Sequence, residues 1–195
     1  MKIELDKIAT FRVAGNFTGH LEQAGESKDF INIKTAEECA PKGIFPTYLP
    51  LSKKDEKASV SIPDYLTVFP FDESKIIFPQ NEQNIQIEPE CAILFDVEWN
   101  CNCNLFFKND AAKLRNLKPI AFFASNDCSI RKEGSRKISQ KKNWGLSSKG
   151  YAISSPIYFD DFSSDGIIND YNIVSFILRD NQLIQYGEDC SIKDY

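Results

Sequence analysis

Two glutamates separated by one residue, Glu88 and Glu90, are the pair of side chains whose types and spacing best suggest chemistry. In an extended strand alternate side chains lie on the same face, so both carboxylates would point the same way and could reach one ion. Asp127 could supply a third carboxylate. Oxygen ligands without paired thiolates or imidazoles favour Mg²⁺, Mn²⁺ or Ca²⁺ over Zn²⁺, because hard donors suit hard cations. The alternative is a solvated strand face, on which alternating acids are common.

The composition indicates the elements that must position these acids. The chain has 195 residues, of which 42% are hydrophobic and 26% charged, and this fits one globular domain with a core of its own. Fifteen Phe and seven Tyr favour strands, whereas a single Met argues against a helical bundle. We therefore expect a mainly β (α+β) fold with short helices.

Charge and hydropathy narrow the classes of partner and location. The net charge of −5 and the pI near 5.0 argue against nucleic acid and anionic membrane as partners. No stretch approaches the roughly 20 apolar residues that span a bilayer, and residues 1–6 are too acidic and mixed for a signal peptide. The six cysteines form no Cys-x-x-Cys pair, so we expect reduced, mostly buried thiols in a cytoplasmic protein.

Alternating and continuous apolar runs predict the order of the elements. The predicted strands or extended segments lie within residues 3–17, 44–49, 85–99, 119–125 and 151–159, and a hairpin joins 173–178 to 182–186 across the turn at Asp180 and Asn181. A short helix is predicted at 110–117.

The stretch 131–142 carries six basic residues among Gly and Ser. It is typical of a solvated, mobile loop, and the alternatives are a lid or an attraction for an anionic substrate.

Several short motifs follow one another along the chain, and their order is informative. They are Gly-Asn-Phe-Thr-Gly-His at 15–20, Pro46, Glu-Pro-Glu at 88–90, Ser-Asn-Asp-Cys-Ser-Ile-Arg at 125–131, Trp144, Lys-Gly-Tyr at 149–151 and Ser-Pro-Ile at 155–157. In this order they resemble the fumarylacetoacetate hydrolase family, from about Phe11 to the C-terminus. The resemblance implies a single catalytic domain over 1–195 with a β-roll fold, in which an N-terminal part, about 1–60, contributes a histidine loop.

The resemblance also implies roles for individual residues. Glu88, Glu90 and Asp127 match the family's ligands for Mg²⁺, or for Mn²⁺ or Ca²⁺. Lys149 matches an active-site lysine near the metal and the substrate oxygens. Arg131 matches an arginine that we expect to buttress the Asp127 loop.

His20 matches the family histidine that acts with a nearby glutamate to activate water. Three positions after it, where many catalytic members carry glutamate, this chain has Gln23. An amide can orient an imidazole but does not stabilise imidazolium as a carboxylate does, so Glu22 or Glu26 would have to take over. Family members also continue with a Gly-Thr-Pro segment that has no counterpart after Tyr195, which is expected of a truncated product or of a divergent short version.

The first functional hypothesis is a divalent-metal-dependent hydrolase or lyase, including decarboxylases and isomerases. Its substrate would be a small 2-oxo acid or 1,3-dicarbonyl compound that reacts through a metal-stabilised enolate. The alternative, favoured by Gln23, is a non-catalytic binding or scaffold protein of the same fold. A third hypothesis is a protein that binds nucleic acid through residues 131–142. The net negative charge of the chain argues against it. The resemblance leads us to expect a homodimer.

Overall fold

The structure is a computed structural model that describes residues 3–14, 33–35, 40–50, 62–100, 113–131, 137–187 and 189–192. Within these ranges the chain is mainly β with short helices, as the composition predicted. The described helices are α3 (Ile138–Lys142) and the 3-10 helices η1 (Leu5–Lys7), η3 (Asp64–Leu66) and η4 (Ile167–Asp170). None of the helices in these ranges is long and apolar enough to cross a bilayer.

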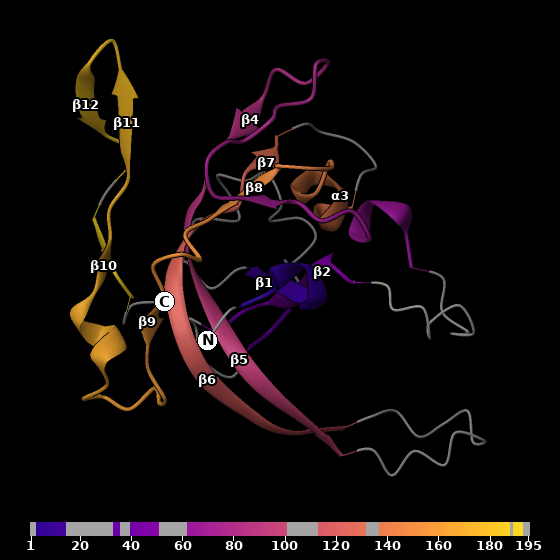
Figure 1. Cartoon of the computed structure of the whole chain (residues 1–195), viewed down its shortest axis with the longest axis vertical. Helices are drawn as coiled ribbons and strands as arrows, with labels where there is room; N and C mark the ends of the chain where they lie inside the picture. The colour runs from indigo at the N-terminus through magenta and orange to yellow at the C-terminus, as the bar shows by residue number, and fades with distance from the viewer. Residues whose placement is uncertain are drawn as a thin grey trace. The chain divides into compact units, whose positions relative to one another are not determined.

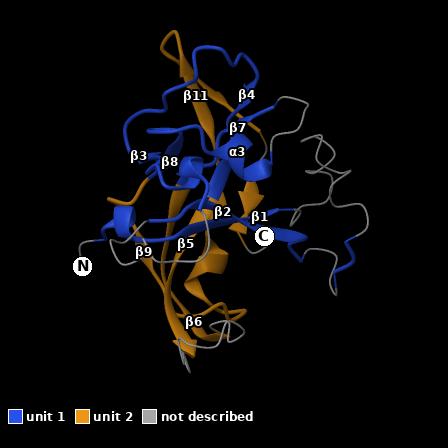
Figure 2. Cartoon of the chain, turned by 90° about the vertical axis from the view of Figure 1, so that its right-hand side faces the viewer, with its two compact units in different colours: residues 1–90, 125–151, 195 blue, residues 91–124, 152–194 orange. Residues whose placement is uncertain are grey.

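The strands follow one another along the chain as Figure 1 shows. They are β1 (Thr10–Ala14), β2 (Gly43–Tyr48), β3 (Phe71–Asp72), β4 (Ile85–Gln86), β5 (Pro89–Asn100), β6 (Lys113–Asn126), β7 (Ser129–Ile130), β8 (Lys149–Tyr151), β9 (Ile157–Tyr158), β10 (Asn172–Ile173), β11 (Phe176–Arg179), β12 (Gln182–Gln185) and β13 (Cys190–Ser191). Their contacts divide the chain into two compact units, which Figure 2 shows in blue and orange. Unit 1 comprises residues 1–90, 125–151 and 195, and unit 2 comprises 91–124 and 152–194.

Unit 1 holds three sets of paired strands. β1 and β2 form an antiparallel ribbon, β4 pairs with β7, and β8 lies between β3, to which it is parallel, and the end of β6, to which it is antiparallel. Aromatic side chains pack between these elements: Tyr48, Phe69 and Phe71 make edge contacts, and Phe71 stacks on Tyr151 with ring centroids 4.2 Å apart. Offset and edge arrangements of this kind suit the quadrupoles of the rings.

Unit 2 is built on the rest of β6, which lies between β5 and β9. The buried run predicted at 119–125 is confirmed, and Phe122 packs with Phe159 and Ile168 in the core of this unit. The predicted hairpin is confirmed over residues 176–185: β11 pairs with β12 across Asp180 and Asn181, both of which have positive φ. Two consecutive residues of this kind characterise the type I′ turn that matches the twist of a two-stranded ribbon. Ile173, predicted in its first strand, lies in β10 and pairs with Cys190 of β13 instead.

Several predicted segments differ from the structure. Leu5–Lys7, within the predicted strand 3–17, form η1, and residues 152–156, within the predicted segment 151–159, separate β8 from β9. The strand predicted over 85–99 is divided into β4 and β5, because Pro89 has no N–H to donate and the carbonyl of Glu88 accepts from Asp127 outside the ladder. Residues 113–117, predicted as part of a helix, are strand, since they belong to β6 and pair with β5 in the sheet. The predicted mobile loop at 131–142 ends in α3, of which Ser139 and Lys142 are buried.

Candidate metal centre

Backbone pairing brings together acidic segments that are distant in the sequence. The N–H of Asp127 donates to the carbonyl of Glu88 over 2.9 Å, directly beside the β4–β7 pair. In the antiparallel pair of β6 and β8, Asn126 faces Gly150. The same register, continued by one residue, places Asp127 beside Lys149. The acid and the lysine therefore meet because of strand pairing rather than through side-chain reach alone.

The three predicted carboxylates converge. One ligand oxygen from each of Glu88, Glu90 and Asp127 lies within 4.8 Å of the others. Glu88 and Asp127 are buried, and Glu90 is partly buried. Asp127 Oδ1 is a buried oxygen that accepts no hydrogen bond. A buried oxygen of this kind is costly unless a charge lies beside it, and here Lys149 Nζ at 3.1 Å and Arg12 Nε at 3.5 Å supply that charge while leaving its hydrogen-bonding capacity unused.

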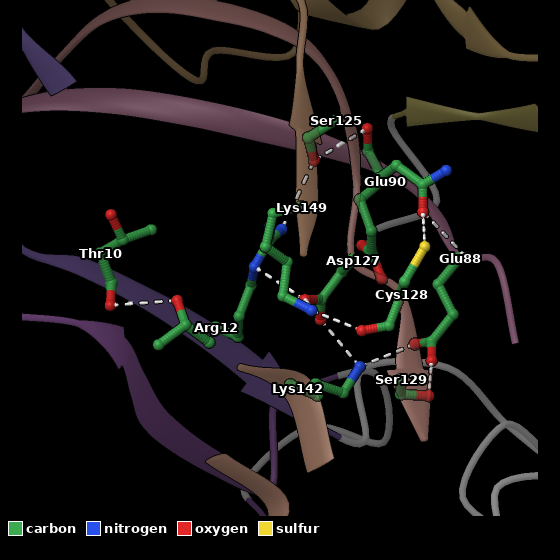
Figure 3. A network of polar contacts seen from close by, with 12 residues as sticks. Thr10, Arg12, Glu88, Glu90, Ser125, Asp127, Cys128, Ser129, Lys142 and Lys149 are labelled. Atoms are coloured by element: carbon green, nitrogen blue, oxygen red, sulfur yellow. Dashed lines mark hydrogen bonds and ion pairs between the residues drawn. The ribbon is translucent and has the colours of Figure 1, made fainter. Parts of the chain in front are cut away.

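Glu88 is held by basic and hydroxyl groups from two segments, residues 129–131 and α3, and Figure 3 shows Ser129 and Lys142 beside it. Lys142 Nζ lies 2.7 Å from Oε2, and Arg131 Nη2 donates to Oε1 over 2.9 Å. The hydroxyl of Ser129 donates to Oε1 as well. Arg131 also donates from Nε to Gln86 Oε1, so it ties the segment 127–131, in which it lies, to the segment 86–88. Its role in buttressing the Asp127 loop stays a prediction.

Asp127 faces three cations. Lys142 Nζ lies 2.7 Å from Oδ2, while Lys149 Nζ at 3.1 Å and Arg12 Nε at 3.5 Å lie nearest Oδ1. Burial alone would raise the pKa of this carboxyl, but the three positive charges outweigh burial and hold the pKa well below its usual range. Asp127 is therefore ionised throughout the physiological range of pH.

Lys149 is a completely buried lysine at the start of β8. Its ammonium donates to the carbonyl of Cys128 and lies 5.1 Å from the centroid of the Trp144 ring. Burial lowers its pKa to about 8, although the charge of Asp127 opposes this shift. Near neutral pH this side chain is thus charged yet close to losing a proton.

Glu90 differs from the other two acids because no cation forms an ion pair with it among the described residues. Burial raises its pKa to about 7, with a partial offset from the charge of Arg12. A carboxyl in this state exchanges its proton near neutral pH. It would gain most from a further positive charge close by.

Arg12 lies in β1 with an unexpected orientation. Its guanidinium is buried, whereas Phe11 and Val13 on either side are about half exposed, at 55% and 48%. Nη1 donates to Ser125 Oγ over 3.4 Å, and the guanidinium carbon lies 5.4 Å from the centroid of the Tyr151 ring. Nε and Nη2 make no hydrogen bond. These two atoms form the edge of arginine that matches a carboxylate in two parallel hydrogen bonds.

The balance of charge in the described cluster is positive. Three carboxylates face four basic side chains, which are Arg12, Arg131, Lys142 and Lys149. A buried cluster of this kind favours an additional anion, because the unpaired positive charge is costly in a medium of low dielectric constant.

The sequence therefore pointed to Glu88, Glu90, Asp127 and Lys149, and the structure brings these four together. Arg12 and Lys142 were missed. Arg12 carries no signal that separates it from an exposed strand residue, and Lys142 is one of six similar basic residues in its stretch. The remaining predicted site residues lie outside the described residues, and these are His20, Glu22 and Gln23.

One comparison with known proteins gives a result. A family profile described as "Family of unknown function (DUF5718)" matches residues 26–195. The chain belongs to this family. Neither the curated proteins nor the solved structures contain a match. Within this DUF5718 chain the matched range includes the three acids and both buried lysines, whereas Arg12 and His20 precede it.

The donor set of this DUF5718 member fits a hard divalent ion. Two oxygens bound to one ion lie at most about 4.2 Å apart for Mg²⁺ and about 4.8 Å apart for Ca²⁺, given typical metal–oxygen distances. The observed limit of 4.8 Å agrees with such a site after small side-chain adjustments. Two further features agree with a bound cation: Asp127 Oδ1 accepts no hydrogen bond, and the pKa of Glu90, raised to about 7, would fall beside a positive charge.

Proposed function

We propose that this chain is a divalent-metal-dependent hydrolase or lyase that acts on a small 2-oxo acid or 1,3-dicarbonyl compound. The observation that carries the proposal is the convergence of three carboxylates, one of which has a buried oxygen without a hydrogen bond. Glu88, Glu90 and Asp127 would hold Mg²⁺, Mn²⁺ or Ca²⁺. When bound, the ion would supply Lewis acidity toward the substrate oxygens.

The chain's own residues would supply binding and proton transfer. Arg12 would bind a substrate carboxylate through Nε and Nη2, neither of which makes a hydrogen bond. Lys149 would place a positive charge beside the oxygens that gain electron density, and its pKa of about 8 also suits it to give up a proton. His20 stays the predicted base for water. The substrate would be anionic because the cluster already has more positive than negative side chains.

We also propose a specific fold within the mainly β class. The order of the sequence motifs supports a fumarylacetoacetate hydrolase-like β-roll, and the mainly β arrangement agrees with it. A cytoplasmic location and a homodimer stay predictions of the sequence.

The test compares the wild-type chain with Glu90→Gln after removal of metal by a chelator. Glutamine keeps the size of the side chain, and Glu90 forms no ion pair with any residue that the structure describes, so the variant should fold. A site filled at about 100 times Kd adds roughly 2.7 kcal/mol of stability, which corresponds to an increase in Tm of about 5–10 °C for a chain of this size. We expect Mg²⁺ or Mn²⁺ to raise the Tm of the wild type by several degrees and that of Glu90→Gln much less. No increase with Mg²⁺, Mn²⁺ or Ca²⁺ would contradict the proposal.

A second candidate is a non-catalytic binding protein of the same fold. It is favoured by Lys142, whose ammonium already neutralises Glu88 and Asp127 without any ion. Metal-dependent stabilisation together with no decay of oxaloacetate or acylpyruvates above the buffer rate would select this candidate. Decay that requires both the metal and Lys149 would select the enzyme.

A further inference from the structure

Lys142 differs in one respect from the other basic residues of the described cluster. Its ammonium contacts two of the acids, at 2.7 Å from Glu88 Oε2 and 2.7 Å from Asp127 Oδ2. Arg131 pairs with Glu88, whereas Arg12 and Lys149 pair with Asp127. Lys142 is thus the cation that bridges the two carboxylates, and Figure 3 shows its ammonium between them.

We propose that Lys142 is a tethered cation that fills the space between Glu88 and Asp127 in the metal-free protein, and that a divalent ion binds there by displacing it. The inference rests on the proposed function, because it takes these carboxylates as ligands of the ion. An ammonium and a divalent ion cannot both lie against the same two carboxylates without strong repulsion. Binding is therefore an exchange of one cation for another.

The exchange requires movement of one side chain only. The backbone of α3 is fixed at its end by Asn143, whose N–H donates to the carbonyl of Ser139 and whose side-chain amide donates to the carbonyl of Thr47 over 2.7 Å. Lys142 carries its charge on a flexible four-carbon stem, so rotation about its side-chain bonds can carry the ammonium away while α3 remains in place.

The exchange has a consequence for the affinity of the site. The metal-free cluster is already neutralised in part, so the ion gains only the difference between its own attraction and that of the ammonium. The site would then fill only at ion concentrations well above those that three unopposed carboxylates would need. Lys142 therefore sets the concentration range in which the protein binds its ion.

The test measures Mn²⁺ affinity of the wild type, Lys142→Met and the control Lys137→Met by calorimetry on metal-stripped protein. Methionine keeps the length of the side chain and removes its charge, and Lys137 is an exposed lysine at the start of the same helix. We expect Lys142→Met to bind Mn²⁺ at least tenfold more tightly than the wild type, and Lys137→Met to bind like the wild type. Binding by Lys142→Met alone would support the same conclusion.

Equal or weaker binding by Lys142→Met would overturn the role of Lys142 and leave the metal site itself standing. Failure of both proteins to bind any divalent ion would overturn the metal site and the exchange together.

A second measurement uses the wild type, in case Lys142→Met does not fold. Reductive methylation with and without saturating Mn²⁺, read by mass spectrometry, reports the accessibility of each lysine. Lys142 is 6% exposed in the metal-free structure. We expect its labelling to rise severalfold with Mn²⁺, while that of Lys137 stays constant. Continued protection of Lys142 after calorimetry has shown saturation would overturn the exchange, and absence of Mn²⁺ binding would count against both proposals.

Discussion

Lys149 Nζ lies 3.1 Å from Asp127 Oδ1 in the interior of unit 1, and strand register determines this proximity. Asn126 of β6 pairs with Gly150 of β8 in an antiparallel arrangement. Asp127, which follows Asn126, therefore lies opposite Lys149, which precedes Gly150. Lys142 binds the second oxygen of the same carboxylate. Asp127 is therefore the acid on which most of the positive charge converges, and the fold depends on its ionised form.

Replacement of Asp127 by asparagine should destabilise the metal-free chain strongly. The variant leaves Lys149 and Lys142 buried with less compensation, and removal of one partner from a buried ion pair costs about 3–5 kcal/mol. Urea unfolding at pH 7 measures the loss, with the exposed Asp160→Asn as the control. A loss below about 1 kcal/mol would mean that the cations do not depend on this carboxylate.

Glu90 predicts how stability changes with pH in the absence of metal. Its pKa is about 7 in the folded state and 4.5 for an ordinary glutamate exposed to water, so between these values the folded state holds a proton that the unfolded state has lost. Stability should fall as pH rises from about 5 to about 7, by roughly 2–3 kcal/mol from this group.

Glu90→Gln removes the titrating group, so the stability of this variant should fall much less between pH 5 and pH 7. The control Glu98→Gln, at an exposed glutamate, should lose stability as the wild type does. Urea unfolding at pH 5, 6 and 7 in the presence of a chelator measures the difference. Parallel curves for wild type and Glu90→Gln would show that Glu90 is ionised at pH 5 in the folded chain as well.

Some of this site was predictable because the information is local. The spacing of Glu88 and Glu90 holds both acids near one point, and it does so although the strand is interrupted between them. The hairpin was predictable because Asp and Asn tolerate the positive φ of its turn.

The rest depends on tertiary contacts that no local pattern encodes. Alternation in β1 would place Phe11 and Val13 inside, but the sheet buries the opposite face because Arg12 meets Asp127 there. In α3, Lys142 lies three residues after Ser139 and therefore on the same, buried face of the helix, toward the acids. Lys141 lies on another face and is less buried. Residues 113–117 became strand because β5 provides a pairing partner.

Asn181→Gly should stabilise the β11–β12 hairpin slightly. Asn181 has φ of 61° and follows Asp180 with φ of 50°, and glycine adopts such angles without a steric penalty. The greater freedom of glycine in the unfolded chain offsets part of the gain, so we expect an increase in Tm of about 1–2 °C. Differential scanning calorimetry measures it, with Asn181→Ala as a control that should lower the Tm. A lower Tm for glycine would contradict the assigned turn.

Arg12→Lys tests whether the Nε and Nη2 edge of the guanidinium, which makes no hydrogen bond, recognises an anion. Lysine keeps the positive charge beside Asp127 but cannot present the two parallel donors, Nε and Nη2, that make no hydrogen bond in this structure. Loss of one charge-assisted hydrogen bond is worth about 1.5 kcal/mol, so oxalate, a small dicarboxylate, should bind about tenfold more weakly. Calorimetric titration of oxalate into metal-loaded protein measures the change.

Two controls separate recognition by Arg12 from general effects on the fold. Arg115→Lys makes the same substitution at an exposed arginine and should leave oxalate affinity unchanged. Mn²⁺ affinity of Arg12→Lys should stay within about threefold of the wild type, because the charge beside the carboxylates is retained. If Arg12→Lys binds oxalate as tightly as the wild type does, the Nε and Nη2 edge of Arg12 does not contact the anion, and the bound ion with the neighbouring lysines would hold it instead.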